Sequence, residues 1–328
     1  MRTEKELILA TKTFAKENRL ISWAYTLSTL LILIGLVIGT IWKFHWIGKL
    51  VCSILVAFVM VRMFVIYHDY QHKSILENSI IAKIIMAIYG ILVLNPPSIW
   101  KRSHDYHHKH NSKLFSASIG SYPIMTKSKF LSASRGEKFE YLATRHPLTI
   151  LFGYIFMFIY GMCFNSFLYQ PKKHWDAGFA LILHFIIIGI ISWFGDWQTL
   201  IFTIFIPFFI SSAMGAYLFY AQHNFPGVTF KNSNKEWNYF DASMESSSYM
   251  KMNRIMRWFM ANIGYHHIHH LNSRIPFYRL PEAMEKVPEF QNVKTTSLHP
   301  IEIFRCLRLK LWDAESNKMI GLFELKKG

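Results

Sequence analysis

The sequence has few charged residues and few cysteines for its length. Only 17% of its 328 residues are Asp, Glu, Lys or Arg, whereas about a quarter is usual in soluble proteins. A chain with 52% hydrophobic residues has too few polar side chains for the surface of an ordinary soluble enzyme, and it is too apolar to be disordered. The three cysteines lie far apart, so we expect no disulfide framework.

Acidic residues are scarcer than basic ones, at 20 against 36, which gives a net charge of +16. A basic excess can attract nucleic acid, anionic lipid or an acidic protein. In a chain this apolar, it is more typical of Lys and Arg on the cytoplasmic side of a membrane, so we expect no nucleic-acid partner. The sequence contains no Walker motif and no serine nucleophile elbow, which argues against a P-loop nucleotidase and an α/β-hydrolase.

Long apolar runs predict how the chain crosses the membrane, since about 20 such residues span the bilayer core. We expect four spanning helices, at residues 21–42, 47–67, 178–194 and 198–221. The run 80–94 is short and ends at Asn95-Pro96-Pro97, so we expect an interfacial or re-entrant helix. The run 148–169 has basic residues at both ends, so we expect it to dip into the membrane and return, with a bend at Gly153 or Gly161.

The positive-inside bias predicts the orientation. Residues 1–20 mix basic and apolar residues, which is typical of an amphipathic helix on a membrane surface. Their positive charges place the N-terminus in the cytoplasm. We therefore expect a single domain over residues 1–328, with an amphipathic segment (1–20), a membrane region (21–225) and a cytoplasmic cap (226–328).

Nine of the sixteen histidines follow spacings that suit metal binding. They are His68 and His72, His104, His107 and His108, His223 directly after the last span, and His266, His269 and His270. Side chains at i, i+3 and i+4 share one face of a helix. Imidazole suits zinc, copper, iron and nickel. Nine ligands exceed what one ion takes, so the pattern predicts two metal ions but does not divide the ligands between them.

The other histidines and the nearby carboxylates have different expected roles. We expect polar packing for His45, His146, His174, His184 and His299. His110 and His267 lie beside the clusters but point off their shared faces. Metal-bound imidazoles usually donate their second N–H to a carboxylate or carbonyl. The candidate carboxylates are Asp69, Asp105, Asp241 and Glu245.

These motifs resemble those of the membrane fatty acid desaturases, a histidine-box di-iron family. The resemblance rests on four stretches: residues 68–72, 100–108, 219–223 and, above all, 262–281. Within the family, the sequence is most similar to the bacterial and plant acyl-lipid desaturases of the omega-6 (Δ12) type. Tyr70-Gln71 departs from the Cys-Gly of many relatives, and the residues after His223 also differ. These departures leave the position of the double bond open.

The resemblance implies a fold, a cofactor and a reaction. The fold would be an all-α integral membrane protein, with four spanning helices and membrane-embedded helices under a cytoplasmic cap. The nine histidines would hold two iron ions. With O2 and two electrons from a separate donor, a ferredoxin or a cytochrome b5-like protein, the site would place a cis double bond in a fatty acyl chain. The acyl chain would belong to a lipid rather than to acyl-CoA, and the membrane would be a bacterial inner membrane.

Two other functions remain open. Related di-iron membrane hydroxylases and ketolases, which act on carotenoids, alkanes or sphingolipids, would use the same histidine boxes. A membrane metal transporter is less favoured, because transport needs ionisable residues inside the membrane. His184 is the only histidine well inside an expected span, and no acidic residue accompanies it.

Overall fold

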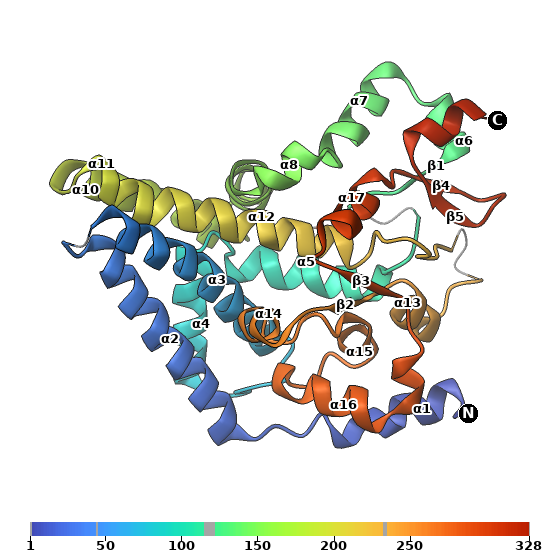
Figure 1. The fold of residues 1–328 in the computed structure, drawn as a ribbon, viewed down its shortest axis with the longest axis horizontal. Helices are drawn as coiled ribbons and strands as arrows, with labels where there is room; N and C mark the ends of the chain where they lie inside the picture. Colours follow the sequence, from blue (N-terminus) through green and yellow to red (C-terminus); the bar gives the residue numbers. More distant parts are fainter. Residues whose placement is uncertain (1, 44, 115–121, 232–234, 328) are drawn as a thin grey trace.

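A computed structural model describes residues 2–43, 45–114, 122–231 and 235–327. The fold is mostly helical (Figure 1). Within these ranges, four helices are long and apolar enough to cross a membrane: α2 (Arg19–Ile41), α3 (Trp46–Gln71), α10 (Trp175–Phe194) and the continuous helix Trp197–Ala221. The last comprises α11 (Trp197–Leu200), the π-helical turn η3 (Ile201–Phe205) and α12 (Ile206–Ala221). The predicted membrane protein with four spanning helices is confirmed.

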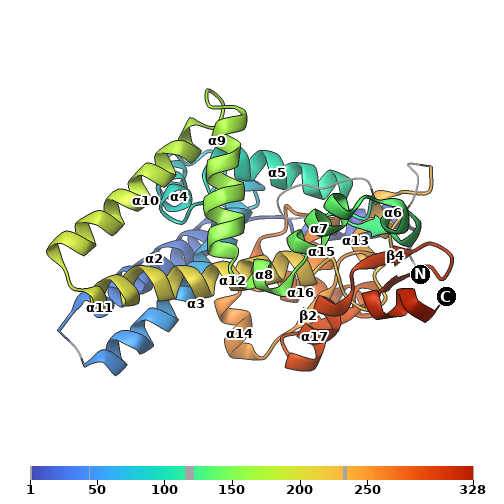
Figure 2. The same ribbon diagram turned by 90° about the horizontal axis from the view of Figure 1, so that it is seen from above.

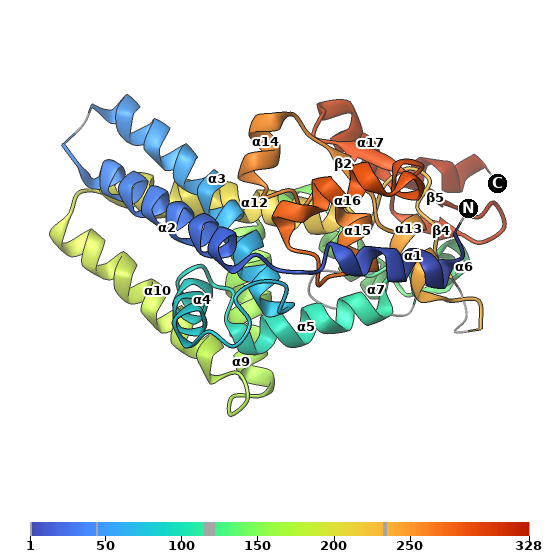
Figure 3. The same ribbon diagram turned by 90° about the horizontal axis from the view of Figure 1, so that it is seen from below.

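The four helices form a bundle with two distinct ends. The links from α2 to α3 and from α10 to α11 lie together at one end, and both chain termini lie at the other (Figures 1 and 3). Large apolar side chains such as Leu31, Ile34 and Ile38 on α2 are exposed. Exposed apolar side chains along the length of a helix are what a lipid environment requires. The surface of the bundle is therefore suited to contact with lipid. The segments that do not belong to the four long helices gather mainly at the end where both termini lie (Figure 1).

A buried arginine joins the bundle to the rest of the chain. Arg62 of α3 is 3% exposed. Its Nε donates to Thr29 Oγ1 on α2 at 3.1 Å, and its guanidinium lies 4.2 Å from the Trp258 ring centroid in α14 (Arg254–Phe259). These contacts offset the desolvation of a cation inside an apolar helix.

The two shorter apolar runs do not cross as single straight helices. Helix α4 (Ile80–Leu92) meets α5 (Pro97–His110) at a bend of 92°, because Pro96 and Pro97 cannot continue the helix. Helix α8 (Pro147–Leu151) is followed by η2 (Tyr154–Asn165), which is π-helical, and by α9 (Ser166–Tyr169). Figure 2 shows α8 beside α12 and the helix formed by η2 and α9 extending away from α12. Phe152, whose backbone angles are not helical, separates α8 from η2, whereas Gly153 is helical and Gly161 lies within η2. Gly153 allows close packing on α12, because a Cβ there would lie 3.0 Å from Ala216 Cβ.

The cap consists of short elements that cover the histidine end of the bundle. It contains α13 (Tyr239–Glu245), α14, α15 (His266–Leu271), α16 (Leu280–Lys286) and α17 (Pro300–Arg308), with 3-10 turns η4 (Phe277–Arg279), η5 (Pro288–Gln291) and η6 (Leu322–Lys327). Strand β2 (Tyr249–Lys251) pairs in parallel with β3 (Thr295–Ser297). Strand β4 (Leu311–Asp313) pairs with β1 (Met125–Thr126) and with β5 (Lys318–Ile320). Because β1 is followed by α6 (Lys127–Ser132) and α7 (Arg135–Thr144), the cap also draws on residues before 226.

The N-terminal segment packs on this cap. Helix α1 (Glu4–Ala10) is followed by the 3-10 turn η1 (Thr11–Thr13), and its Leu7 is 1% exposed. The Thr11 hydroxyl accepts a hydrogen bond from Asn272 Nδ2 at 2.8 Å, and Arg2 pairs with Glu289. The expected membrane-surface helix is thus amphipathic, but protein covers its apolar side.

Candidate metal centre

The candidate site lies where three helices and one turn meet, at the end of the bundle that the cap covers. The C-terminal end of α3 carries His68, α5 carries three histidines on its buried face, α15 carries three more, and His223 follows α12. Pro97 begins α5 at a position where a missing N–H costs nothing. The structure brings all nine predicted histidines together.

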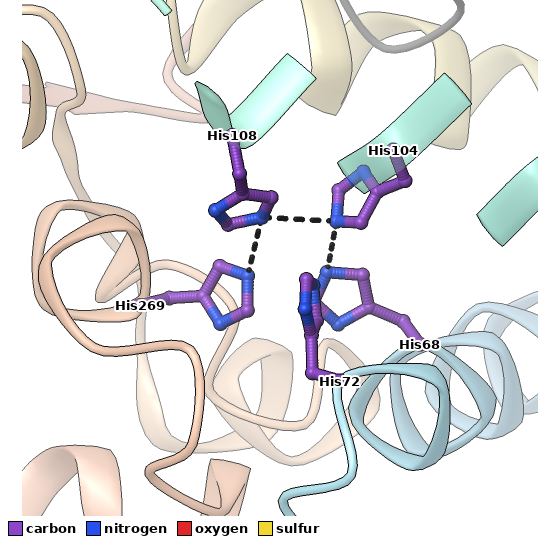
Figure 4. Close-up of side chains that lie close together, drawn as sticks. All are labelled: His68, His72, His104, His108 and His269. Carbon is purple, nitrogen blue, oxygen red and sulfur yellow. Dashed lines mark hydrogen bonds between the residues drawn. The ribbon is translucent and has the colours of Figure 1, made fainter. Parts of the chain in front are cut away.

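The nine histidines form two separate groups. The first histidine group contains His68, His72, His104, His108 and His269, and the second contains His107, His223, His266 and His270. In each group the ligand nitrogens all lie within 4.8 Å of one another. Figure 4 shows the rings of the first group pointing toward a common centre from α3, α5 and α15. The division that the sequence left open is therefore five and four.

The nitrogen contacts within each group are too many for ordinary hydrogen bonding. In the first group, His104 Nε2 lies 2.8 Å from His68 Nε2 and 3.1 Å from His108 Nε2, and His108 Nε2 lies 3.2 Å from His269 Nε2. In a neutral imidazole each nitrogen has either one N–H or one lone pair. A single ring nitrogen therefore cannot form hydrogen bonds to two neighbouring ring nitrogens at once. Lone pairs that converge on one central cation explain these short distances better than hydrogen bonds do.

The second histidine group repeats this pattern. His266 Nε2 lies 2.9 Å from His223 Nε2 and 3.1 Å from His270 Nε2, and His270 Nε2 lies 3.2 Å from His107 Nε2. Metal–nitrogen bonds of about 2.1 Å at right angles would place two donors about 3 Å apart. The spacing in both groups fits that geometry.

Burial prepares these rings as ligands. His72 Nε2 in the first group is buried without a hydrogen-bond partner, as expected of a lone pair aimed at a metal. Burial lowers the pKa of His223 to about 4, and burial with neighbouring histidines lowers the pKa of His266 and His270 well below the usual value. At neutral pH these imidazoles are uncharged and can donate a lone pair to a metal.

Two supporting contacts hold individual rings. Asp69 Oδ1 lies 3.2 Å from His68 Nδ1, in the role expected from the sequence. His223 Nδ1 lies 2.9 Å from the Ser246 carbonyl oxygen, a backbone acceptor that no sequence pattern indicated. Trp100 stacks on His104 with ring centroids 4.8 Å apart and planes 13° from parallel, which restricts that ring further.

The other three candidate carboxylates are placed elsewhere. Asp105 lies on the exposed side of α5 and pairs with Lys101 at 2.8 Å, which contradicts its expected role beside a histidine. Asp241 contacts Asn238, the N-cap of α13: Asn238 Oδ1 accepts the Asp241 N–H at 2.7 Å, and Asp241 Oδ2 accepts from Asn238 Nδ2 at 2.8 Å. Glu245 accepts a hydrogen bond from the Thr229 hydroxyl at 3.1 Å. Each of these three carboxylates has a local contact, so of the four candidates Asp69 is the one that the structure places against a histidine of the two groups.

The remaining histidines lie outside both groups. His45, His146 and His299 each accept a backbone N–H as the N-cap of a helix. His184 Nε2 lies 2.5 Å from the Tyr154 hydroxyl inside the bundle, and His174 contacts the Ser98 hydroxyl at 2.8 Å. His110 and His267 belong to neither group. These seven histidines therefore either make local structural contacts or lie outside the two groups.

An apolar cavity reaches both histidine groups. Its walls include Val61 and Phe64 of α3, Phe158 of η2 and Gly215 of α12. His68 and His104 of the first group and His266 of the second also line it. No Asp, Glu, Lys or Arg is among its lining residues in the part of the chain that the structure describes. Such a cavity suits a hydrocarbon chain and excludes a charged group.

The fold and the site together define a class: a helical membrane protein with two histidine metal groups beside an apolar cavity. Comparison of sequences makes this specific. A family profile described as fatty acid desaturase matches residues 44–295, and the chain belongs to the fatty acid desaturase family. It is therefore an oxidoreductase of a family that depends generally on metal.

Individual relatives agree with this assignment. The chain is 29% identical over 278 residues to a fatty acid desaturase of Bacillus subtilis, covering 84% of this chain and 78% of that protein. It is 22% identical over 291 residues to the sn-1 oleoyl-lipid 12-desaturase of Anabaena variabilis, covering 85% and 80%. The chloroplastic omega-6 fatty acid desaturase of Spinacia oleracea is 24% identical over 235 residues, and the match spans 69% of this chain and 50% of that relative.

Proposed function

We propose that this protein is an O2-dependent desaturase that introduces a cis double bond into a fatty acyl chain of a membrane lipid, of the Δ12 or omega-6 type. The observation that carries the proposal is the apolar cavity lined by histidines of both groups. The relatives named above support the Δ12 or omega-6 type. One of them is named for action on an oleoyl lipid, which supports a lipid rather than acyl-CoA.

The metal ions in this proposal are two irons, one in each histidine group. Neutral nitrogen ligands suit iron as well as zinc or copper, and the family supplies the choice of iron. When bound, the two irons supply the oxidising power, together with O2, that acid–base side chains lack for an unactivated methylene. The overall change removes two hydrogens from neighbouring methylenes, consumes O2, two electrons and two protons, and forms two waters.

The residues of this chain bind and orient the acyl chain and exclude water. Val61, Phe64 and Phe158 offer the apolar walls. Because the cavity carries no charged side chain, the polar headgroup must stay outside while the methylenes enter. His68 and His104 form part of the cavity wall and belong to the first histidine group, so an acyl chain in the cavity passes close to that group. Asp69 keeps the His68 ring from turning.

We place the site on the cytoplasmic side of an inner membrane. Helix α1 lies at the same end of the bundle as α5 and α15, which carry histidines of both groups (Figure 1). The N-terminal segment that contains α1 carries Arg2, Lys5, Lys12 and Lys16. The positive-inside bias supports a cytoplasmic location for this end. There the site can receive electrons from a soluble carrier, a ferredoxin or a cytochrome b5-like protein.

Fatty acid methyl ester analysis by gas chromatography–mass spectrometry tests the proposed function. A bacterial host expresses the chain with a ferredoxin system, beside His107→Ala in the second histidine group and His299→Ala as a control outside both groups. A new unsaturated ester that His107→Ala abolishes and His299→Ala retains supports desaturation, and its fragmentation places the double bond. A product with added oxygen would instead support a hydroxylase or ketolase, and absence of any product from iron-loaded protein would contradict the proposal.

A further inference from the structure

Helix α5 has two chemically different faces. Its buried face carries His104, His107 and His108. Its outer face carries Lys101, Arg102 and Lys109, which are exposed, and Tyr106, which is 43% exposed. Figures 2 and 3 both show α5 along the rim of the molecule, with no other helix outside its middle. The metal ligands and the exposed cations are thus separated by the width of one helix.

The positive charge of the outer face is largely unneutralised. Asp105 is the one acidic residue of α5, and it pairs with Lys101 at 2.8 Å. Arg102 contacts Gln170 Oε1 at 3.0 Å, an uncharged acceptor. Lys109 has no ion-pair partner among the residues that the structure describes. Among the described residues, Arg102 and Lys109 thus have no carboxylate partner, and the face carries a net positive charge. Such a face attracts an acidic protein and accelerates its association.

An aromatic pair lies in the middle of these cations. The rings of Tyr106 and His110 stack with centroids 3.8 Å apart and planes 15° from parallel. Exposed tyrosine is enriched at protein interfaces, because it buries a large rigid area at low entropic cost. Tyr106 directly precedes His107 of the second histidine group. A redox partner on this face would therefore lie about one helix diameter, roughly 10 Å, from a metal ligand.

We propose that the outer face of α5, formed by Lys101, Arg102, Tyr106 and Lys109, is the docking surface for an acidic one-electron carrier protein. The inference rests on the proposed function, because desaturation needs an external source of electrons. In each turnover two reduced carriers would each lose one electron. These two electrons, two protons from water and the two hydrogens taken from the acyl chain together reduce one O2 to two waters.

Binding measurements with charge-reversed protein test the proposal. The iron-loaded protein is placed in nanodiscs of zwitterionic lipid, and its affinity for an oxidised acidic [2Fe–2S] ferredoxin is measured at several salt concentrations. Lys101→Glu with Lys109→Glu should weaken binding at low salt by at least about tenfold, with a smaller difference at high salt. Lys318→Glu, an exposed reversal on β5 away from α5, should leave the affinity unchanged. Tyr106→Ala keeps the charge and should also weaken binding.

A second measurement separates docking from chemistry. Reduction of the iron by reduced ferredoxin, followed by stopped-flow absorbance, should slow in the Lys101→Glu, Lys109→Glu protein, while reduction by dithionite should not change. Equal losses in that protein and in Lys318→Glu, or no loss in either, would overturn the proposal. A loss that appears only in nanodiscs of anionic lipid would overturn it in favour of contact with lipid headgroups. Binding of oxidised ferredoxin does not require turnover. If charge reversal on α5 weakens this binding but the dithionite-reduced protein forms no double bond, the docking proposal stands and the proposed function fails.

Discussion

Asp69 contacts His68 from the next position of the same helix, with its Oδ1 3.2 Å from the ring Nδ1. The other carboxylate oxygen accepts the backbone N–H of Phe277 at 2.6 Å. Asp69 therefore links the first histidine group to the chain segment that follows α15. A carboxylate in this position fixes the tautomer and orientation of a metal-binding imidazole.

Replacing Asp69 should therefore weaken metal binding without removing a ligand. We expect Asp69→Asn to lower the affinity for iron by about 10- to 100-fold, the usual effect of losing such a support. Competition with a chelator, followed by absorbance, measures this affinity. Asp105→Asn provides the matched control, because Asp105 pairs with Lys101 on the outer face of α5. Similar losses in both variants would contradict the role of Asp69.

The two histidine groups should lose metal independently. His72→Ala removes a ligand of the first group, and His223→Ala removes one of the second. Because the groups share no ligand, we expect each variant to retain about half of the iron of the unmodified protein. Metal analysis by mass spectrometry gives the iron content per chain. Complete loss of iron in both single variants would show that the nine histidines act as one site.

Filling the cavity should impair turnover but spare the metal. Gly215 lines the apolar cavity, and a Cβ there would lie 3.7 Å from Phe158. We expect Gly215→Leu to lower desaturation of long acyl chains by at least about tenfold, because the side chain occupies the volume that methylenes need. Gly189→Leu on α10, where nothing lies within 4 Å, should keep its activity. Product analysis measures the effect, and full activity of Gly215→Leu would argue against this cavity as the acyl site.

The start of α5 should matter for both histidine groups. Pro96 supplies no side-chain cap to α5. Asp176 at the start of α10 takes that role, since its Oδ2 accepts the Ser98 N–H at 3.0 Å and its Oδ1 accepts the Ser98 hydroxyl at 2.5 Å. Loss of such a cap costs about 1 kcal/mol.

Asp176→Ala should thus lower the melting temperature and reduce iron occupancy, because α5 supplies ligands to both groups. Asp196→Ala removes the N-cap of α11 at the far end of the bundle and serves as control. It should lower the melting temperature without affecting the iron content. Equal loss of iron in both variants would contradict a positioning role for Asp176.

Helical spacing predicted the nine histidines but not their division. His104 and His108, four residues apart, belong to the first group, whereas His107 belongs to the second. In α15, His266 and His270 share the second group, and His269 belongs to the first. Residues four apart lie nearly above one another on a helix, whereas a residue three apart points away by about 60°. Positions i+3 and i+4 share the broad buried face of the helix, which predicts nine ligands, but they point about 100° apart, which lets them serve different groups.

The supporting contacts depend on surroundings that a sequence pattern does not contain. Asp69 and Asp105 both follow a histidine directly, yet Asp69 is fully buried and Asp105 is not. Residues 65–69 of α3 are all buried, so Asp69 stays inside, whereas α5 leaves one side at the surface. The Ser246 carbonyl that holds His223 is a backbone atom, and its position follows from the fold of the cap rather than from its residue type.

The positions of the metal ions decide whether the two histidine groups are two separate metal sites. Anomalous diffraction from crystals of the iron-loaded protein, recorded on both sides of the iron absorption edge, shows where iron lies. We expect two peaks, one among the nitrogens of His68, His72, His104, His108 and His269, and one among those of His107, His223, His266 and His270. A single peak between the groups, or iron bound away from them, would contradict this expectation.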